Sequence, residues 1–167
     1  MGYVPAERKT EGMVGPMSVA DNMTLAKQRV RCAGPVVVPQ RQADVVDRWI
    51  DRLSIRTPGR RTAIGRLSGG NQQKVVLARW LVGGDVRLLL LDHPTRGLDV
   101  GARSEVYRLM RELAAGGVAT LLLADSLEEA IGMADRVVVM SDGRVVTEVP
   151  CPADAKPSPL DLVKEMV

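Results

Sequence analysis

The fold of this chain is decided by residues 67–103, LSGGNQQKVVLARWLVGGDVRLLLLDHPTRGLDVGAR. Two glycines follow Ser68 and open a segment rich in Val, Leu and Ala, which predicts a helix over residues 71–82. The apolar run at residues 86–92 then ends on Asp92, as expected of a strand that is buried on both faces of a sheet.

The segments that follow extend this pattern. A helix near residues 102–115 leads to a second apolar run at residues 118–125, for which we expect the same complete burial. A strand, a helix and a strand in succession predict parallel pairing with a right-handed crossover. The sequence therefore indicates an α/β fold with a parallel sheet.

The remaining segments predict further helices and one hairpin. Ser18 is placed to cap a helix that runs to residue 25, and apolar residues at helical spacing predict a helix with one buried stripe over residues 42–54. Another helix is expected at residues 127–133, a hairpin turns at Asp142-Gly143, and a Pro-rich linker precedes a helical C-terminus at 160–167. We expect residues 1–83 to form a helical subdomain, 84–149 an α/β part, and 150–167 the linker and final helix.

Composition excludes several classes of protein. The chain has 167 residues, 23 basic and 20 acidic side chains, and a net charge of +3, with no basic run that would favour nucleic-acid binding. Aromatic residues make up only 2%, and no apolar run is long enough to span a bilayer. The two cysteines, Cys32 and Cys151, form no metal-binding motif, so we expect reduced thiols.

The Ser68-Gly69-Gly70 segment is a candidate anion site. Backbone N–H groups at a helix start, together with a hydroxyl, favour a negatively charged ligand. Taken alone, the same three residues also describe an ordinary turn and helix cap.

Asp92 and Asp99 are candidate ligand-facing acids. A carboxylate at the C-terminal end of a buried strand is where P-loop ATPases coordinate Mg²⁺, although a lone aspartate there can also cap the next turn. Asp99 follows in a loop that contains Pro94 and Gly97.

Taken in order, these motifs resemble the ATP-binding cassette (ABC) transporter ATPases. LSGGNQQK, LLLLD, the PTRG and DVGA segments that follow His93, LLLAD and MADRVVVMSDGR resemble the family's motifs in their order, and GYVPAERKTEGMVGPMSVADNM is similar to the second domains of the ribose, galactose and xylose importer ATPases. The resemblance covers nearly the whole chain and implies an incomplete P-loop NTPase-type core with a helical signature subdomain.

The resemblance also assigns roles to residues. It implies that Ser68, Gly69, Gly70 and Gln72 form the signature motif, which contacts the γ-phosphate of ATP held by a partner domain. Asp92 would act on Mg²⁺ through water, as the Walker B carboxylate. The same resemblance gives three further positions: Asp99 in the D-loop at the domain interface, Ala6 at the Q-loop, and Asp125 at the switch position.

One required element is absent from the sequence. A P-loop has the form GxxxxGK[ST], and none of the five lysines follows a glycine. We therefore expect the chain to begin after the P-loop and to bind ATP and Mg²⁺ tightly only with a partner P-loop. In the family, that strand lies between those at residues 118–124 and 136–140, so its loss would leave apolar strand edges open to self-association.

His93 stands where the family has a glutamate that polarises the attacking water. A neutral imidazole can accept a proton, but it lacks the negative charge that orients water beside Mg²⁺. We therefore expect hydrolysis at this site to be weak. The less favoured alternative is that His93 and Asp125 pair and rebuild a base in swapped order, which His93→Glu in an assembled transporter would test.

The resemblance implies a partial nucleotide-binding domain of a sugar importer. Its expected partners are a second nucleotide-binding domain with a Walker A motif, membrane permease subunits and, indirectly, a sugar-binding protein, with no nucleic acid. Its expected location is the cytoplasmic face of the membrane, as a peripheral subunit. A non-catalytic docking module and a non-functional remnant remain open alternatives, and Ser68→Arg separates the docking module from the nucleotide-contacting domain.

Overall fold

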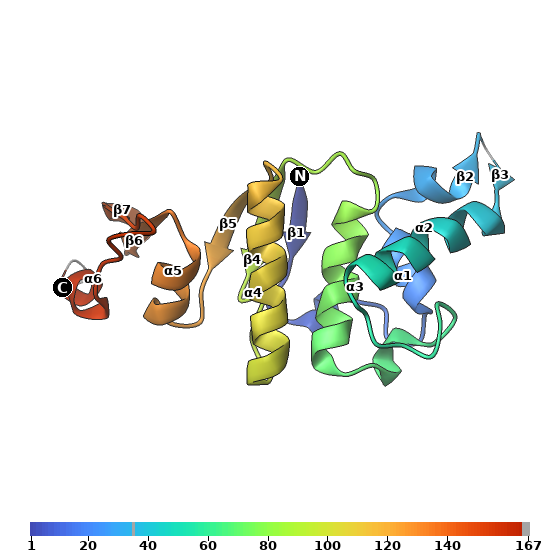
Figure 1. Cartoon of the computed structure of the whole chain (residues 1–167), viewed down its shortest axis with the longest axis horizontal. Helices are drawn as coiled ribbons and strands as arrows, with labels where there is room; N and C mark the ends of the chain where they lie inside the picture. The colour runs from blue at the N-terminus through green and yellow to red at the C-terminus, as the bar shows by residue number, and fades with distance from the viewer. Residues whose placement is uncertain (35, 165–167) are drawn as a thin grey trace. The chain divides into compact units, whose positions relative to one another are not determined.

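The structure is a computed structural model that describes residues 1–34 and 36–164. Contacts within the chain define two compact units, Met1–Leu121 and Leu122–Val167 (Figure 1). The functional boundaries expected at residues 83/84 and 149/150 concern sequence motifs rather than compactness, and they remain predictions.

The first unit is built on a sheet with the strand order β1-β4-β5, formed by β1 (Gly2–Val4), β4 (Leu88–Asp92) and β5 (Ala119–Leu123). The outer strand β1 pairs with β4 in parallel, with Tyr3 opposite Leu90. The helix α4 (Val100–Ala115) connects β4 to β5, so the predicted strand–helix–strand unit is confirmed.

Helices make up the rest of this unit, and the predicted ones are present within a few residues of their expected limits. They are α1 (Val19–Thr24), α2 (Pro39–Arg52) and α3 (Gly69–Leu81), with a π-helical turn at Arg8–Gly12 and 3₁₀ turns at Gln28–Arg31 and Ile64–Arg66. The Ser18 cap is confirmed, since its hydroxyl accepts a hydrogen bond from the N–H of Asp21 at 3.1 Å. A short antiparallel pair follows α1, formed by β2 (Cys32–Ala33) and β3 (Val36–Val37).

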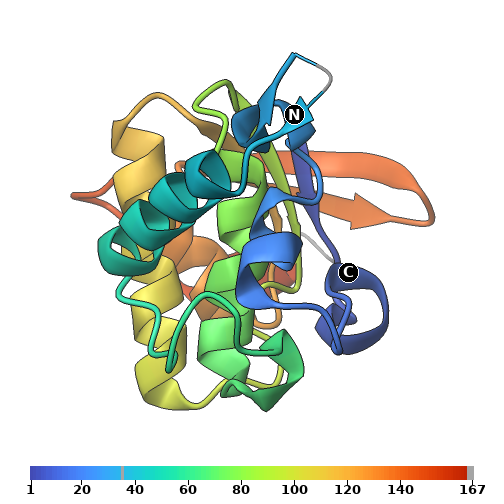
Figure 2. The same cartoon turned by 90° about the vertical axis from the view of Figure 1, so that its right-hand side faces the viewer.

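The core of the first unit lies around α3. Figure 1 shows α3 between α4 on one side and α1 and α2 on the other, and α3 contacts both α4 and α1. Figure 2 shows the same helices from the side of α2, which lies in front. Burial of each large apolar side chain stabilises the fold by about 1.5–3 kcal/mol. The largest fully buried apolar side chains of this unit are Met23, Ile64, Leu77, Leu89 and Leu91.

The prediction that the two apolar strands are completely buried is wrong. In β4, only Leu89 and Leu91 are buried, and Leu88, Leu90 and Asp92 are partly exposed. In β5, Leu121 is 55% exposed and Leu123 is 49% exposed. The exposed residues 119, 121 and 123 alternate along β5 and therefore share one face, which is left accessible to solvent. The strand is also an edge strand, with a described neighbour on one side only. An apolar edge of this kind is an aggregation hazard.

The apolar stripe predicted on α2 is only partly buried. Val46 is fully buried, and Leu53 just beyond the helix is 4% exposed. Val45, Trp49 and Ile50 remain partly accessible. The prediction of one buried stripe on this helix is therefore confirmed only in part.

The second unit has its own small core. It contains α5 (Leu127–Met133), the antiparallel strands β6 (Arg136–Ser141) and β7 (Arg144–Pro150), and α6 (Pro159–Lys164). The predicted hairpin turns at Asp142 and Gly143, both at positive φ (49° and 75°), which is the conformation that Asp-Gly favours. Ile131, Val139 and Leu162 form the buried cluster. The end of the predicted C-terminal helix, residues 165–167, lies outside the described residues.

Both cysteines are free thiols, as expected. Among residues 1–34 and 36–164, the structure has no helix with the length and apolar character needed to cross a bilayer.

Candidate functional site

The N-terminus of α3 presents backbone donors without an internal cap. Ser68 is exposed and occupies the N-cap position, but its side chain accepts no hydrogen bond from the helix backbone. Its Oγ instead accepts a hydrogen bond from Nδ2 of Asn71 at 2.8 Å. In α4, by contrast, the cap residue Asp99 accepts one from the N–H of Ala102. The first-turn N–H groups of α3 thus remain available to an anion.

The second glycine of the segment is required by packing. A Cβ on Gly70 would lie 2.6 Å from the Cβ of Ala102, in the first turn of α4. Carbon atoms at van der Waals contact are about 3.5–4.0 Å apart. Gly70 therefore lets the N-terminal ends of α3 and α4 approach more closely than any other residue would allow.

The first glycine accommodates a cationic side chain. A Cβ on Gly69 would lie 3.1 Å from Nη2 of Arg8 and 3.4 Å from Cδ2 of Leu98. Arg8 begins the π-helical turn that follows β1, and Leu98 belongs to the loop between β4 and α4. Three segments that are distant in sequence thus converge at the start of α3.

Gln72 holds this arrangement from inside the protein. Its Nε2 donates to the carbonyl of Leu67 at 3.0 Å, and its Oε1 accepts a hydrogen bond from Nε of Arg8 at 3.3 Å. The residue is only 4% exposed, which leaves little surface for a ligand. In this structure Gln72 shapes the corner and orients Arg8, and its expected contact with nucleotide stays a prediction.

An ion pair fixes α3 against α4 one turn further on. Nζ of Lys74 lies 2.6 Å from Oε2 of Glu105 and donates to the carbonyl of Ser54 at 3.0 Å. The hydrogen bond from Lys74 is the main cause that lowers the pKa of Glu105 below its ordinary value. The lysine side chain is only 5% exposed, so its charge depends on this partner.

Asp92 ends β4 and lies beside the hydroxyl of Tyr3. The phenol donates to Oδ2 of Asp92 at 3.2 Å. Loss of solvent contact, followed by this hydrogen bond, raises the pKa of Tyr3, which therefore stays protonated and remains a donor. The parallel register of β1 and β4 places Tyr3 opposite Leu90, two residues before Asp92 and on the same face of the sheet.

His93 adopts an uncommon backbone conformation next to Asp92. Its φ is +46°, in the left-handed region that non-glycine residues rarely adopt. This turn places the imidazole Nε2 at 3.7 Å from Oδ1 of Asp92. Asp92 therefore has a phenol on one oxygen and an imidazole near the other.

Asp99 and Asp125 have different surroundings. Asp99 is exposed and caps α4, with its Oδ1 2.8 Å from the N–H of Ala102. Asp125 belongs to the second unit, where its N–H donates to Oε2 of the buried Glu129 at 2.7 Å. The idea of a His93–Asp125 pair stays a prediction, because the two residues lie in different compact units.

Two groups of residues each offer ligands that suit part of an ATP–Mg²⁺ site. The first turn of α3 offers backbone N–H groups and the Ser68 hydroxyl, which suit a phosphate. Asp92 offers one partly exposed carboxylate, suited to a Mg²⁺ ion that keeps most of its water. The described residues include no cluster of three or more His, Cys, Asp or Glu able to hold a metal ion. The remaining ligands of such an ion would have to come from the nucleotide, from water or from a P-loop on a partner domain.

Three residues of this region were not found from the sequence: Tyr3, Arg8 and Ala102. Each touches a predicted site residue from a distant segment of the chain. Tyr3 lies in the short segment GYV, which forms β1. The register of this strand with β4 could not be known from the sequence.

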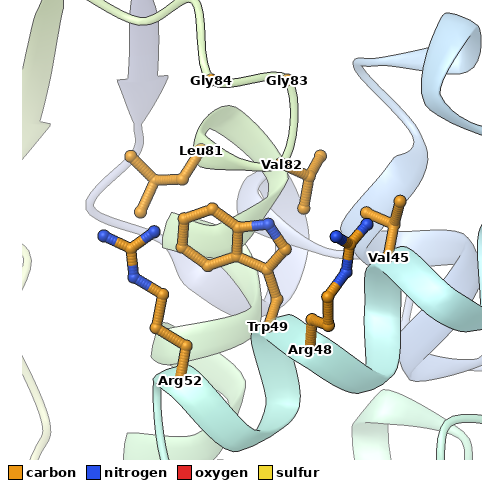
Figure 3. Close-up of a pocket in the computed structure, with 8 residues that line it drawn as sticks. All are labelled: Val45, Arg48, Trp49, Arg52, Leu81, Val82, Gly83 and Gly84. Atoms are coloured by element: carbon orange, nitrogen blue, oxygen red, sulfur yellow. The ribbon is translucent and has the colours of Figure 1, made fainter.

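A separate depression of about 410 Å³ lies at the other end of α3 (Figure 3). Trp49 and Arg48 of α2 face Val82 across it, and the guanidinium of Arg52 lies 4.7 Å from the centre of the Trp49 ring. It contains none of the predicted site residues.

Comparison with known proteins supports the same interpretation of the motifs. The chain is 47% identical, over 161 residues, to the arabinose import ATP-binding protein AraG 2 of Burkholderia ambifaria, covering 96% of this chain and 30% of that protein. It is 47% identical over 149 residues to the putative ribose/galactose/methyl galactoside import ATP-binding protein 1 of Rhizobium etli, covering 89% and 28%. The chain thus spans about 30% of the length of the relatives that it matches.

Solved structures show the same fold. The ATP-binding cassette MJ0796, solved as a dimer in a post-hydrolysis state bound to ADP and Pi, aligns with a TM-score of 0.73 at 21% identity and covers 91% of this chain and 63% of that one. The cassette MJ1267 aligns with a TM-score of 0.71 at 18% identity, covering 90% and 61%. These likenesses confirm the predicted α/β cassette fold.

The sequence pattern of the ABC transporter family matches residues 1–96, more than half of the chain. With the cassette fold and the order of its motifs, this match is sufficient for an assignment: the chain belongs to the ABC transporter family.

Proposed function

We propose that the chain is part of the nucleotide-binding domain of a sugar importer and contributes one face of an ATP site. The observation that carries the proposal is the uncapped start of α3, where Ser68 and the following glycines present donors to an anion. The relatives named as arabinose and ribose/galactose import ATP-binding proteins supply the class of cargo.

In this proposal the nucleotide is held by a P-loop on a partner domain. Ser68, Gly69 and Gly70 contact its γ-phosphate, and Asp99 and the 83% exposed Val100 lie where the two domains meet. Closure of this sandwich drives the membrane permease, which receives sugar from a separate binding protein. The chain then works as a peripheral subunit on the cytoplasmic face of the membrane.

A second group of residues, Asp92, Tyr3 and His93, makes a weak hydrolytic centre. Asp92 takes Mg²⁺ through water, Tyr3 fixes one oxygen of that carboxylate, and His93 stands at the water-polarising position without a negative charge. Asp125 occupies the switch position. The ATP site that contains Asp92 therefore binds nucleotide but hydrolyses it slowly.

Ser68→Arg tests the proposal in the assembled importer. The arginine fills the space of the γ-phosphate, so ATP-driven sugar uptake should fall to background while the chain still co-purifies with its permease. Ser104→Arg is the matched control, because it places the same side chain on an exposed turn of α4. Uptake that survives Ser68→Arg would show that the chain is a docking module without nucleotide contact.

A further inference from the structure

His93 is turned back toward Asp92 by an uncommon backbone conformation. Successive side chains of a strand point to opposite faces, so a residue that continued β4 beyond Asp92 would project away from it. His93 instead has a φ of +46°, although Pro94 favours an extended conformation in the residue before it. The chain thus keeps a strained turn that brings the imidazole to the side of the carboxylate.

The two side chains face each other at a distance that suits a shared ion better than a hydrogen bond. Nε2 of His93 lies 3.7 Å from Oδ1 of Asp92, whereas N–H···O hydrogen bonds are about 2.7–3.2 Å long. Zn²⁺ binds imidazole nitrogen and carboxylate oxygen at about 2.0–2.2 Å. Two such bonds that span 3.7 Å meet at an angle of about 120°, close to the tetrahedral arrangement of Zn²⁺ sites.

The surroundings of the pair also suit a metal ion. Tyr3 donates to Oδ2 of Asp92 at 3.2 Å, while Oδ1 is the oxygen that faces His93. A hydrogen bond of this kind orients a carboxylate that binds a metal through its other oxygen. The side chains of His93 and Asp92 are 32% and 28% exposed, so an ion can reach both and keep water at its other positions.

We infer that Asp92 and His93 together form a binding site for a divalent transition-metal ion, represented here by Zn²⁺. Imidazole nitrogen suits Zn²⁺ and its neighbours in the series, whereas Mg²⁺ takes oxygen ligands. The inference goes beyond the proposed function, in which Asp92 alone takes Mg²⁺ through water, and it requires no nucleotide. With two protein ligands, the site binds Zn²⁺ more weakly than a structural site with four.

The single histidine makes the test specific, because every imidazole signal of the chain belongs to position 93. Zn²⁺ is titrated into the ¹⁵N-labelled chain at about pH 8, where metal ligands are deprotonated, and the two ring nitrogens are followed by NMR. Cys32→Ser serves as the background, since it removes a partly accessible thiol that would compete for Zn²⁺. The Nε2 signal should shift and saturate with Zn²⁺, and it should not respond to Mg²⁺ at the same concentrations.

Asp92→Asn tests the second ligand. It should raise the dissociation constant of Zn²⁺ at least about tenfold, because even a change in the outer shell of a metal site costs that much. Asp51→Asn is the matched control. It removes the same charge from an exposed position of α2 and should change the constant by less than about twofold, as expected of a screened surface charge.

The contrary results are distinct. An Nε2 signal that Zn²⁺ leaves unchanged, or that Mg²⁺ shifts equally, would overturn the site. An equal dissociation constant in Asp92→Asn would show that the imidazole alone binds an adventitious ion. Should Asp92→Asn not fold, the wild-type ring decides, because a response at Nδ1 in place of Nε2 is incompatible with an ion shared with Oδ1. Each of these failures leaves the proposed function standing, since Ser68→Arg tests that function separately.

Discussion

The close approach of Gly70 and Ala102 gives the most exacting test of the packing described here. Gly70→Ala would place a methyl group 2.6 Å from the Cβ of Ala102, about 1 Å inside the ordinary contact distance. Overpacking of this kind costs about 1–3 kcal/mol, and the helix preference of alanine over glycine returns up to about 1 kcal/mol. We expect Gly70→Ala to lower the free energy of unfolding by about 1–2 kcal/mol.

A double-mutant cycle isolates the contact. In Gly70→Ala combined with Ala102→Gly, the two methyl groups no longer meet, and the nearest remaining atom is the Cα of residue 102 at 3.5 Å. The double variant should therefore be more stable than the sum of the single changes predicts, by about 1–2 kcal/mol.

Urea unfolding, followed by circular dichroism, measures the free energy of unfolding of the wild type, the two single variants and the double variant. Gly101→Ala is a suitable control, because its new Cβ would meet only Oδ1 of Asp99 at 3.4 Å, and it should be neutral or slightly stabilising. Additivity of the two changes within about 0.5 kcal/mol would refute the claim that Gly70 is required by its contact with α4.

Two further predictions concern stability. Glu105→Gln leaves the buried charge of Lys74 without its partner and should cost about 1–2 kcal/mol at pH 7, a reduced value because Glu105 is 43% exposed. Since the pKa of Glu105 is lowered from 4.5 on folding, its contribution is present above that pH and disappears as the pH falls through the lowered pKa of the folded state. Unfolding curves of variant and wild type should therefore converge at acid pH, and a constant gap would contradict the pairing. Gly2→Ala would bring a Cβ to 2.6 Å from the Trp80 ring and should lower the melting temperature, whereas Gly15→Ala, with no atom within 4 Å, should not; equal melting temperatures would contradict this packing.

The sequence predicted those features that local chemistry determines. The cap by Ser18, the helix after Gly69-Gly70 and the turn at Asp142 depend on neighbouring residues, and each is present in the structure. Features that depend on strand register could not be predicted in this way. The hydrogen bond between Tyr3 and Asp92 joins residues 89 positions apart, and it exists only because β1 pairs with β4.

Burial was predicted least well, for a physical reason. An apolar run shows that a strand prefers to be covered, but it does not show that another element covers it. In β5, Leu121 and Leu123 remain about half exposed because they share the face of the strand that is left accessible to solvent. The burial of Gln72 could not be predicted for a related reason, since a motif does not reveal that its amide turns inward to the carbonyl of Leu67.

The most direct test of the central claim is the rate at which a maleimide labels Ser68→Cys in the assembled importer, with and without ATP and Mg²⁺. Cys32→Ser removes the accessible natural thiol, and Cys151 is only 1% exposed. If the start of α3 faces ATP held by a partner P-loop, nucleotide should slow labelling at position 68 by about tenfold or more and leave Ser104→Cys unaffected. An unchanged labelling rate at position 68 would contradict the claim that this corner contacts nucleotide.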